Sequence, residues 1–232
     1  ILGSRWDQAN WNQKEFPSHH RLSEVTPDHP VLLRRIDGHA ALANRKAMEL
    51  SGITRETPNP AGGEILRDEK GEPTGIFVDE AMDLIRVSGV TGHGLEALIL
   101  AAQERCLSVG LTGIHDAGIS REEGEIYKKL CDDKKLKMRI YGMIAGGKDL
   151  AALKPLVGYG SGRFTLRACK LSVDGAMGSR GAWLLADYSD RPGHAGLPVT
   201  DPAVIRKVSV TALQNGWQVC VHAIGDRGIR ET

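Results

Sequence analysis

A lysine and a histidine near the ends of two strand-like segments have the side chains best suited to chemistry. Lys170 lies in the segment LRACKLSVDG and His222 in the segment WQVCVHAIGD. A lysine inside a fold is costly unless it is paired or chemically altered, and desolvation makes its ammonium group easier to deprotonate. Neutral imidazole is a ligand of Zn²⁺ and similar divalent ions. Together the two residues indicate a metal centre.

The alternation of side chains along a strand decides which residues share a face with these two. In the first segment, one face is apolar and holds Cys169, Leu171 and Val173. The other face holds Leu166, Ala168, Lys170, Ser172 and Asp174. In the second segment, the less apolar face holds Gln218, Cys220 and His222. Neighbouring parallel strands lie about 4.8 Å apart, so the amine and the imidazole could reach one ion.

Each of the two residues also has other interpretations. A lysine at a strand end can carry its amine out to solvent, and a histidine on a strand is often a hydrogen-bonded core residue. Lys170 could instead be the Schiff-base lysine of an aldolase-like barrel. The chain could also be a non-catalytic fragment used for assembly, with exposed strand edges that pair with another copy. These alternatives remain open at this point.

Helical and strand-like segments alternate from residue 94 onward, with strand starts near residues 111, 138, 166 and 217. This alternation is typical of parallel βαβ units. A doubly wound sheet and a TIM barrel both fit, and the lack of GxGxxG and GxxxxGK[ST] motifs favours the barrel. In a barrel, the carboxyl ends of the strands form the active-site rim. We therefore predict an α/β fold, a partial TIM (β/α)8 barrel over residues 94–232.

Residues 1–93 lack this alternation and are predicted to form an inserted α+β cap region. The segment PVLLRRIDGHA reads as a strand with a polar tip, and ALANRKAMELSG reads as a helix that Gly52 ends. The segment GGEILRDEKGEPTGIFVDEA has two strand-like runs around the turn-forming DEKGEP, which predicts a β-hairpin. We expect this region to pack on the barrel.

Five polar residues at strand ends or in loops are candidates for substrate binding: Asp37, His39, His115, Asp174 and Arg180. Asp37 and His39 follow a strand, and they could alternatively cap the start of the next helix. His115 and its neighbour Asp116 are expected to end a strand on opposite faces, so only one of them can face a pocket. Arg180 lies in the loop GAMGSRGA and could bind a substrate carboxylate, although loop arginines are commonly solvated.

Composition and charge restrict the classes of partner. The chain of 232 residues has 30 basic and 29 acidic residues and a formal net charge of +1. No long basic block occurs, so nucleic acid and anionic membranes are poor partners, and we expect a small-molecule substrate. A homo-oligomer remains open. The four cysteines form no CxxC pair, which predicts reduced thiols in a cytoplasmic protein: Cys106, Cys131, Cys169 and Cys220.

Several long motifs resemble those of the metal-dependent amidohydrolase superfamily. RACKLSVDGAMGSRGAWL and QVCVHAIGDRGIRET look like its type 3 branch, which includes N-substituted formamide deformylase. PVLLRRIDGHAALANRKAMELSGI and PAGGEILRDEKGEPTGIFVDEA are similar to the same branch, so the resemblance covers nearly the whole chain. It implies a (β/α)8 barrel with one or two divalent metals, zinc in the first place. By this resemblance Lys170 is the strand-four lysine, which can be carboxylated and bridge the metals, and His222 is the strand-five histidine.

The resemblance implies hydrolysis of carbon–nitrogen bonds other than peptide bonds, in amides, formamides or cyclic amides. The metal would lower the pKa of bound water towards about 7 and polarise the carbonyl group. The superfamily's His-x-His pair has no counterpart here, because SHHR has a different spacing. A later histidine and the aspartate that shuttles the proton have none either. We therefore expect strands two to five of the barrel, inactive as an isolated segment.

Overall fold

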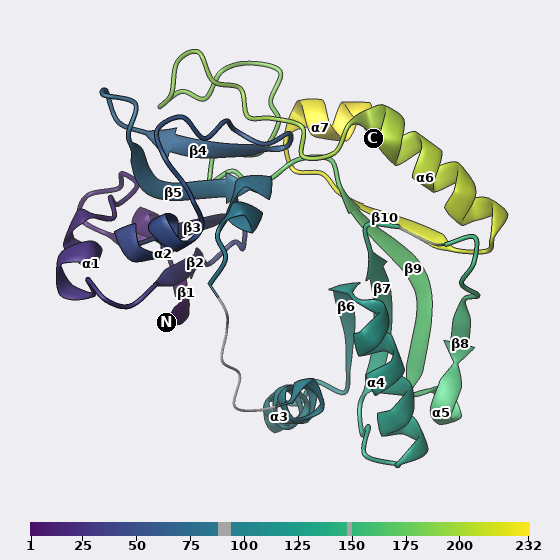
Figure 1. The fold of residues 1–232 in the computed structure, drawn as a ribbon. Coiled ribbons are helices and arrows are strands. Elements are labelled where there is room, and N and C mark those ends of the chain that lie inside the picture. Colours follow the sequence, from purple (N-terminus) through teal and green to yellow (C-terminus); the bar gives the residue numbers. More distant parts are fainter. Residues whose placement is uncertain (88–93, 148–149) are drawn as a thin grey trace. The chain divides into compact units, whose positions relative to one another are not determined.

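The computed structural model describes residues 1–87, 94–147 and 150–232. The chain packs as two compact units, each of which is discontinuous in sequence (Figure 1). The first unit comprises residues 1–90, 172–202 and 223–232. The second comprises residues 91–171 and 203–222. This division differs from the predicted boundary at residue 93, because residues 172–202 and 223–232 pack with the amino-terminal region.

The second unit is built on a sheet with the strand order β10-β9-β7-β6. Its strands are β6 (Gly113–Ile119), β7 (Arg139–Ala145), β9 (Phe164–Ser172) and β10 (Gln218–His222). β6 pairs with β7 in parallel, and β7 pairs with β9 in parallel. The observed strand starts confirm the prediction of an α/β fold with a parallel sheet. A short strand, β8 (Leu156–Gly158), pairs antiparallel with β9.

Helices pack on one face of this sheet and create the core of the second unit. They are α3 (Leu95–Ser108), α4 (Arg121–Asp132) and α6 (Pro202–Gln214), with the short α5 (Tyr159–Gly162). The buried cluster consists of side chains from the strands, from α4 and α6, and from the segment before β10. The strands contribute Ile119, Ile140, Ile144, Phe164 and Cys169; the other members are Leu130 of α4, Ala212 of α6 and Trp217. This packing assigns the two faces of the sheet. Cys169 faces the helices, so Lys170 lies on the opposite face.

A β-bulge in β9 changes the predicted distribution of side chains. Gly142 pairs with Leu166, whereas the next residue, Met143, pairs with Ala168, so the register shifts by one residue. The extra residue moves Leu166 to the helix side of the sheet, where it packs against the same buried cluster as Cys169. The prediction that Leu166 shares the face of Lys170 is therefore wrong, because strict alternation does not hold across a bulge.

The first unit is built on a mixed sheet with the strand order β1-β2-β3-β5-β4. Its strands are β1 (Leu2–Trp6), β2 (Leu32–Arg35), β3 (Ala40–Ala43), β4 (Gly63–Arg67) and β5 (Pro73–Asp79). β1 and β2 are parallel, and the other pairs are antiparallel. The predicted hairpin is confirmed as β4 and β5. The remaining elements are η1 (Gln8–Asn10), α1 (His20–Val25), α2 (Arg45–Leu50), η2 (Glu80–Leu84) and α7 (Asp226–Glu231).

The helix predicted to begin at Ala41 starts later. Residues 40–43 form β3, and α2 begins after Asn44, whose side chain accepts a hydrogen bond from the Ala47 N–H at 2.9 Å. Ala41 and Ala43 pack in one buried cluster, while Ala40 and Leu42 pack in another. Burial on both faces of the strand outweighs the helix propensity of alanine. The alternative that Asp37 or His39 caps this helix is excluded, since Asn44 is the cap.

The long segment 172–202 contacts the first sheet through polar groups. Arg191 donates two hydrogen bonds to the Glu64 carboxylate, at 3.0 and 2.6 Å. The Gln8 side-chain amide donates to the Gly178 carbonyl at 3.2 Å. These contacts explain why the segment belongs to the first unit and not to the unit that contains β9.

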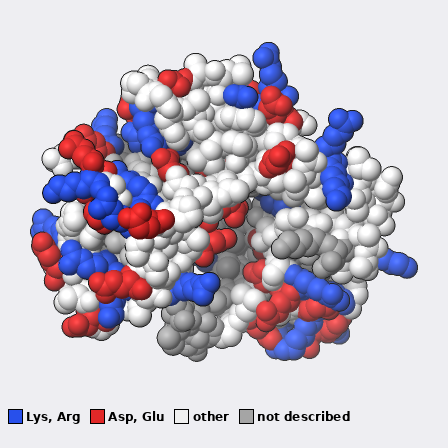
Figure 2. All heavy atoms as spheres, turned by 45° about the horizontal axis from the view of Figure 1, so that its top comes forward, with Lys and Arg blue, Asp and Glu red and all other residues white. Residues whose placement is uncertain are grey.

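Charged side chains of both signs are interspersed on the face of the molecule shown in Figure 2. Among the described residues, no helix combines the length and the apolar character needed to cross a bilayer. All four cysteines are free.

Candidate functional site

Lys170 and His222 lie on neighbouring strands of the second unit. Lys170 is near the carboxyl end of β9, and His222 is the last residue of the adjacent β10. Both side chains are half-buried. The Lys170 ammonium group donates to the Leu171 carbonyl at 3.1 Å, and burial lowers the pKa of Lys170. The structure therefore places the two residues that the sequence singled out on adjacent strands of one sheet.

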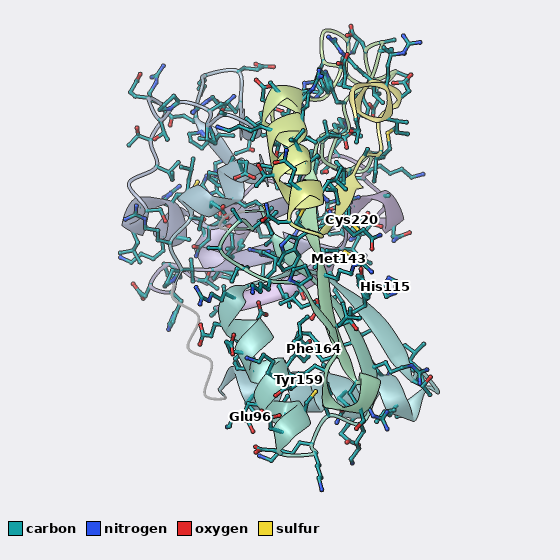
Figure 3. The ribbon with its side chains drawn as sticks, turned by 90° about the vertical axis from the view of Figure 1, so that its right-hand side faces the viewer. Glu96, His115, Met143, Tyr159, Phe164 and Cys220 are labelled. Atoms are coloured by element: carbon teal, nitrogen blue, oxygen red, sulfur yellow. The ribbon has the colours of Figure 1, made fainter. Side chains whose placement is uncertain are left out.

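Other side chains follow the same alternation on this face of the sheet. Val219 packs in the helix-covered cluster, so Cys220 and His222 lie on the side of Lys170. Tyr141 of β7 donates a hydrogen bond to the Gln218 side-chain oxygen at 2.6 Å. Figure 3 shows Cys220 and Met143 towards one end of the sheet. The sequence placed Cys220 on this face without giving it a role.

His115 lies at a different level of the sheet. It is the third residue of β6 and pairs with Tyr141, whereas Lys170 pairs with Ala145. Tyr141 and Ala145 are four residues apart, about 13 Å along a strand. The expectation that His115 ends its strand is therefore wrong, because β6 continues to Ile119. Its ring centroid lies 5.1 Å from that of Tyr141.

Asp116 faces the helices, as the predicted alternation requires. Its carboxylate accepts a hydrogen bond from the Tyr127 hydroxyl of α4 at 2.7 Å. Burial and this carboxylate raise the pKa of Tyr127. The pair therefore links α4 to the sheet.

The donor types at the ends of β9 and β10 fit a divalent metal in part. An imidazole nitrogen is a zinc ligand, and a carboxylated lysine would add anionic oxygens. A closed zinc site usually has four ligands. Across the described parts of the chain, no cluster of three or more His, Cys, Asp and Glu side chains could hold a metal. Lys170 and His222 alone would therefore leave a zinc site incomplete.

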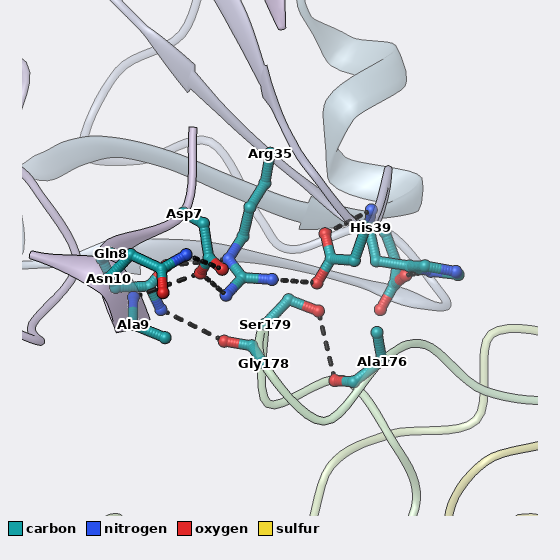
Figure 4. A network of polar contacts seen from close by, with 11 residues as sticks. Asp7, Gln8, Ala9, Asn10, Arg35, His39, Ala176, Gly178 and Ser179 are labelled. Atoms are coloured by element: carbon teal, nitrogen blue, oxygen red, sulfur yellow. Dashed lines mark hydrogen bonds and ion pairs between the residues drawn. The ribbon is translucent and has the colours of Figure 1, made fainter. Parts of the chain in front are cut away.

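A buried arginine organises the polar centre of the first unit (Figure 4). Arg35 is 5% exposed and donates to Asp37 at 2.5 Å, to Asp7 at 2.6 Å and to Gln8 at 2.8 Å. The other oxygen of Asp37 accepts from the His39 N–H at 3.0 Å. Asp37 therefore holds Arg35 and the turn before His39. Sequence reasoning missed Arg35 and Asp7, which are 28 residues apart and meet only in the sheet.

His39 forms a pair with the buried Asp79. The Nδ1 atom of His39 lies 2.6 Å from the Asp79 Oδ1 atom, and the side chains are 22% and 2% exposed. Asp79 has φ 49°, a conformation that non-glycine residues adopt rarely and that often occurs at functional sites. A Cβ atom at Gly175 or Gly181 would lie 2.3 Å from the Asp79 Oδ2 atom. The loop therefore needs glycine at both positions to close over the carboxylate.

Asp174 is fully buried, and its carboxylate is saturated by backbone donors. Oδ2 accepts from the Trp183 N–H at 2.8 Å and from the Gly225 N–H at 2.7 Å. Oδ1 accepts from the Ile224 N–H at 3.0 Å. With 0% exposure, this residue does not have the accessible carboxylate that substrate binding requires. Its predicted role is corrected to an internal one.

Arg180 is engaged by a neighbouring carboxylate. Its guanidinium donates to both Asp190 oxygens, at 3.2 and 2.7 Å, and lies 5.3 Å from the centre of the Phe16 ring. Arg180, Asp190 and Phe16 line a cavity of about 330 Å³. To bind a substrate carboxylate as predicted, Arg180 would therefore have to release Asp190.

Comparison with known proteins places this fold and these motifs in a family. The model of the amidohydrolase family matches residues 1–232. The chain is 34% identical over 240 residues to the protein named "Putative amidohydrolase YtcJ" of Bacillus subtilis (strain 168). The match covers 97% of this chain and 44% of YtcJ. It is 26% identical to the N-substituted formamide deformylase of Arthrobacter pascens, over 99% of this chain and 44% of that protein.

A solved structure extends the likeness to three dimensions. The crystal structure of an uncharacterized metal-dependent hydrolase from Pyrococcus horikoshii OT3 is similar, with a TM-score of 0.66 and 27% identity. The match covers 100% of this chain and 46% of that one. The chain thus spans less than half the length of these relatives. The fold is that of an α/β protein with a parallel sheet, and the chain belongs to the amidohydrolase family.

Proposed function

We propose that the protein is a metal-dependent hydrolase that cleaves carbon–nitrogen bonds other than peptide bonds, such as those of amides, formamides or cyclic amides. The observation that carries this proposal is that Lys170 and His222 share the face of neighbouring strands that lies opposite the helices. Membership of the amidohydrolase family supports it. The name of one relative, N-substituted formamide deformylase, suggests the substrate class.

The order of the strands supports a barrel as the complete architecture. β6, β7, β9 and β10 are neighbours in the order in which they follow one another in the chain. Strands of a (β/α)8 barrel follow this order, whereas a doubly wound sheet reverses it at a switch point. We propose that these strands are strands two to five of the barrel, and that an isolated segment of this length is inactive.

Lys170 and His222 would hold the metal, with zinc as the first candidate. A bound ion would supply Lewis acidity and an activated water. The Lys170 amine has a lowered pKa because it is desolvated. In its neutral form it can attack CO₂, which forms the N–C bond of a carbamate and releases one proton from nitrogen. His222 contributes one imidazole nitrogen. The further ligands would come from other parts of the protein.

We propose that His39 contacts the substrate. Its side chain is partly exposed, and its imidazole is held from behind by Asp79. A carboxylate on Nδ1 fixes the ring orientation, which suits an imidazole that donates a hydrogen bond or a proton. Asp37 would act indirectly, through its bond to the His39 N–H. A small-molecule substrate and a cytoplasmic location belong to the same proposal.

Metal analysis of the full-length protein tests the proposed centre. Protein that has never met a chelator should contain one or two zinc or similar ions per chain by ICP-MS. Lys170→Ala and His222→Ala should each lose most of this metal. His115→Ala is the matched control, because His115 lies on the same sheet but about 13 Å from the level of Lys170. It should keep the wild-type content.

Two outcomes would contradict the proposal: wild-type protein without metal, or full metal content in both ligand variants. Turnover is measured with N-benzylformamide and hydantoin as probes of formamide and cyclic amide hydrolysis. If carbonyl compounds and borohydride instead trap a covalent adduct on Lys170, the aldolase-like interpretation replaces the hydrolase.

A further inference from the structure

We propose that Asp174 is a positioning residue that fixes the turn after His222 and thereby holds this histidine ready for metal. The inference rests on the proposed function, since it concerns the same metal centre. Asp174 itself is too deeply buried to reach a metal or a substrate, with 0% exposure. Its effect must therefore pass through the backbone groups that it binds.

The contacts of Asp174 join two stretches of the first unit, residues 172–202 and 223–232. Its oxygens accept hydrogen bonds from the Trp183, Ile224 and Gly225 N–H groups, at 2.8, 3.0 and 2.7 Å. Ile224 and Gly225 come two and three residues after His222 in the chain. Asp174 comes four residues after Lys170. One carboxylate thus ties together the segments that follow both candidate ligands.

Close packing leaves the turn after His222 little freedom to move. A Cβ atom at Gly225 would lie 1.9 Å from the Trp183 carbonyl oxygen, and one at Gly228 would lie 2.6 Å from the Asp174 Oδ2 atom. The Gly228 N–H donates to the Trp183 carbonyl at 3.1 Å. The Arg227 guanidinium covers the Trp183 ring at 4.6 Å. The two glycines are therefore needed for the approach of this segment to Asp174 and Trp183.

A carboxylate is better suited to this position than any neutral side chain. Three N–H donors converge on two oxygens, and an ionised carboxylate has lone pairs for all of them. An asparagine has the same shape but only one accepting oxygen, and its NH₂ group would face an N–H donor. Asp174→Asn therefore removes at least one bond to the turn without opening a cavity.

The test is the zinc affinity of the full-length protein, measured by competition with a zinc chelator. Asp174→Asn should weaken zinc binding by about 10- to 100-fold, the usual effect of losing a group that orients a ligand. Asp190→Asn is the matched control. It removes a carboxylate from the same segment, but this carboxylate is 59% exposed and pairs with Arg180. It should stay within about twofold of the wild type.

A second measurement uses the wild type alone, so it does not depend on how the variant folds. If the turn and the metal site are coupled, zinc should slow hydrogen exchange at the Ile224 and Gly225 amides by about tenfold relative to zinc-free protein. Unchanged exchange at both amides, or unchanged affinity in a folded Asp174→Asn variant, would overturn this inference alone. A wild type that binds no zinc would overturn it together with the proposed function.

Discussion

The histidines of this protein differ mainly in the groups that their imidazole rings contact. His39 is held by a buried carboxylate at 2.6 Å, whereas the His115 ring lies tilted against a tyrosine ring, at a centroid distance of 5.1 Å. The Nε2 atom of His194 lies within hydrogen-bonding distance of the Arg180 carbonyl oxygen, at 2.8 Å. His19 is buried against the Ser23 hydroxyl, and burial lowers its pKa. Of these four, the first has the environment of an acid, a base or a substrate contact.

His39→Gln should therefore keep its metal and lose turnover. Glutamine can still hydrogen-bond but cannot exchange a proton near neutral pH, so kcat/KM should fall by about 10²- to 10⁴-fold if His39 transfers a proton. The measurement uses full-length protein and whichever probe the wild type hydrolyses best. His29→Gln, at an exposed position, serves as the control. Wild-type kcat/KM in the His39 variant would refute a role at the substrate.

At the scale of elements, both local sequence signals and long-range packing determine where helices begin and which way side chains face. The start of α4 is local: the Ser120 hydroxyl accepts from the Glu123 N–H at 3.1 Å, and the Glu123 carboxylate accepts from the Ser120 N–H at 2.7 Å. Such a capping box satisfies two donors that the helix leaves unpaired. The face of Leu166, by contrast, depends on the register of β9 against β7. There a single extra residue decides which side chains point inward.

Ser120→Ala should destabilise the protein without affecting the metal. Loss of the cap should reduce the free energy of unfolding by about 1 kcal/mol, as is usual at this position. Urea unfolding followed by circular dichroism measures the change, and Ser120→Thr should restore most of it, because threonine can cap in the same way. A Ser120→Ala variant with wild-type stability would show that tertiary packing alone sets this helix start.

At the scale of the whole molecule, the chain passes between its two units several times. The first unit consists of residues 1–90, 172–202 and 223–232. Its amino-terminal part therefore needs the two later segments to complete the unit. The later segments supply Arg191 to Glu64 and bring Gly175 and Gly181 against Asp79. Without them, charged groups of the sheet would lose their partners.

A fragment of residues 1–90 should therefore be less stable than the same region within the chain. We expect either no cooperative unfolding transition or a clearly lower urea midpoint, because Glu64 loses Arg191 and Asp79 loses its glycine cover. Tryptophan fluorescence of Trp6 and Trp11 follows this region in the fragment. A fragment with the midpoint of the intact chain would mean that the first sheet folds independently.

Local patterns in the sequence determined much of the second unit. The alternation of strands and helices, the strand starts and the faces of Lys170 and His222 follow from periodicity, because hydrophobic burial acts on each short segment separately. The β4–β5 hairpin follows from turn chemistry. The family motifs added Lys170 and His222 as candidate metal ligands, but they gave no distances between these residues.

Tertiary structure alone decided which polar residues meet. The pairs Arg35–Asp7, His39–Asp79 and Glu64–Arg191 join residues 28, 40 and 127 positions apart. The burial of Asp174, the bulge beside Leu166 and the strand at Ala40–Ala43 likewise depend on neighbours distant in the chain. A sequence window shows which groups need partners, but strand pairing and loop closure select those partners, since they bring remote segments within bonding distance.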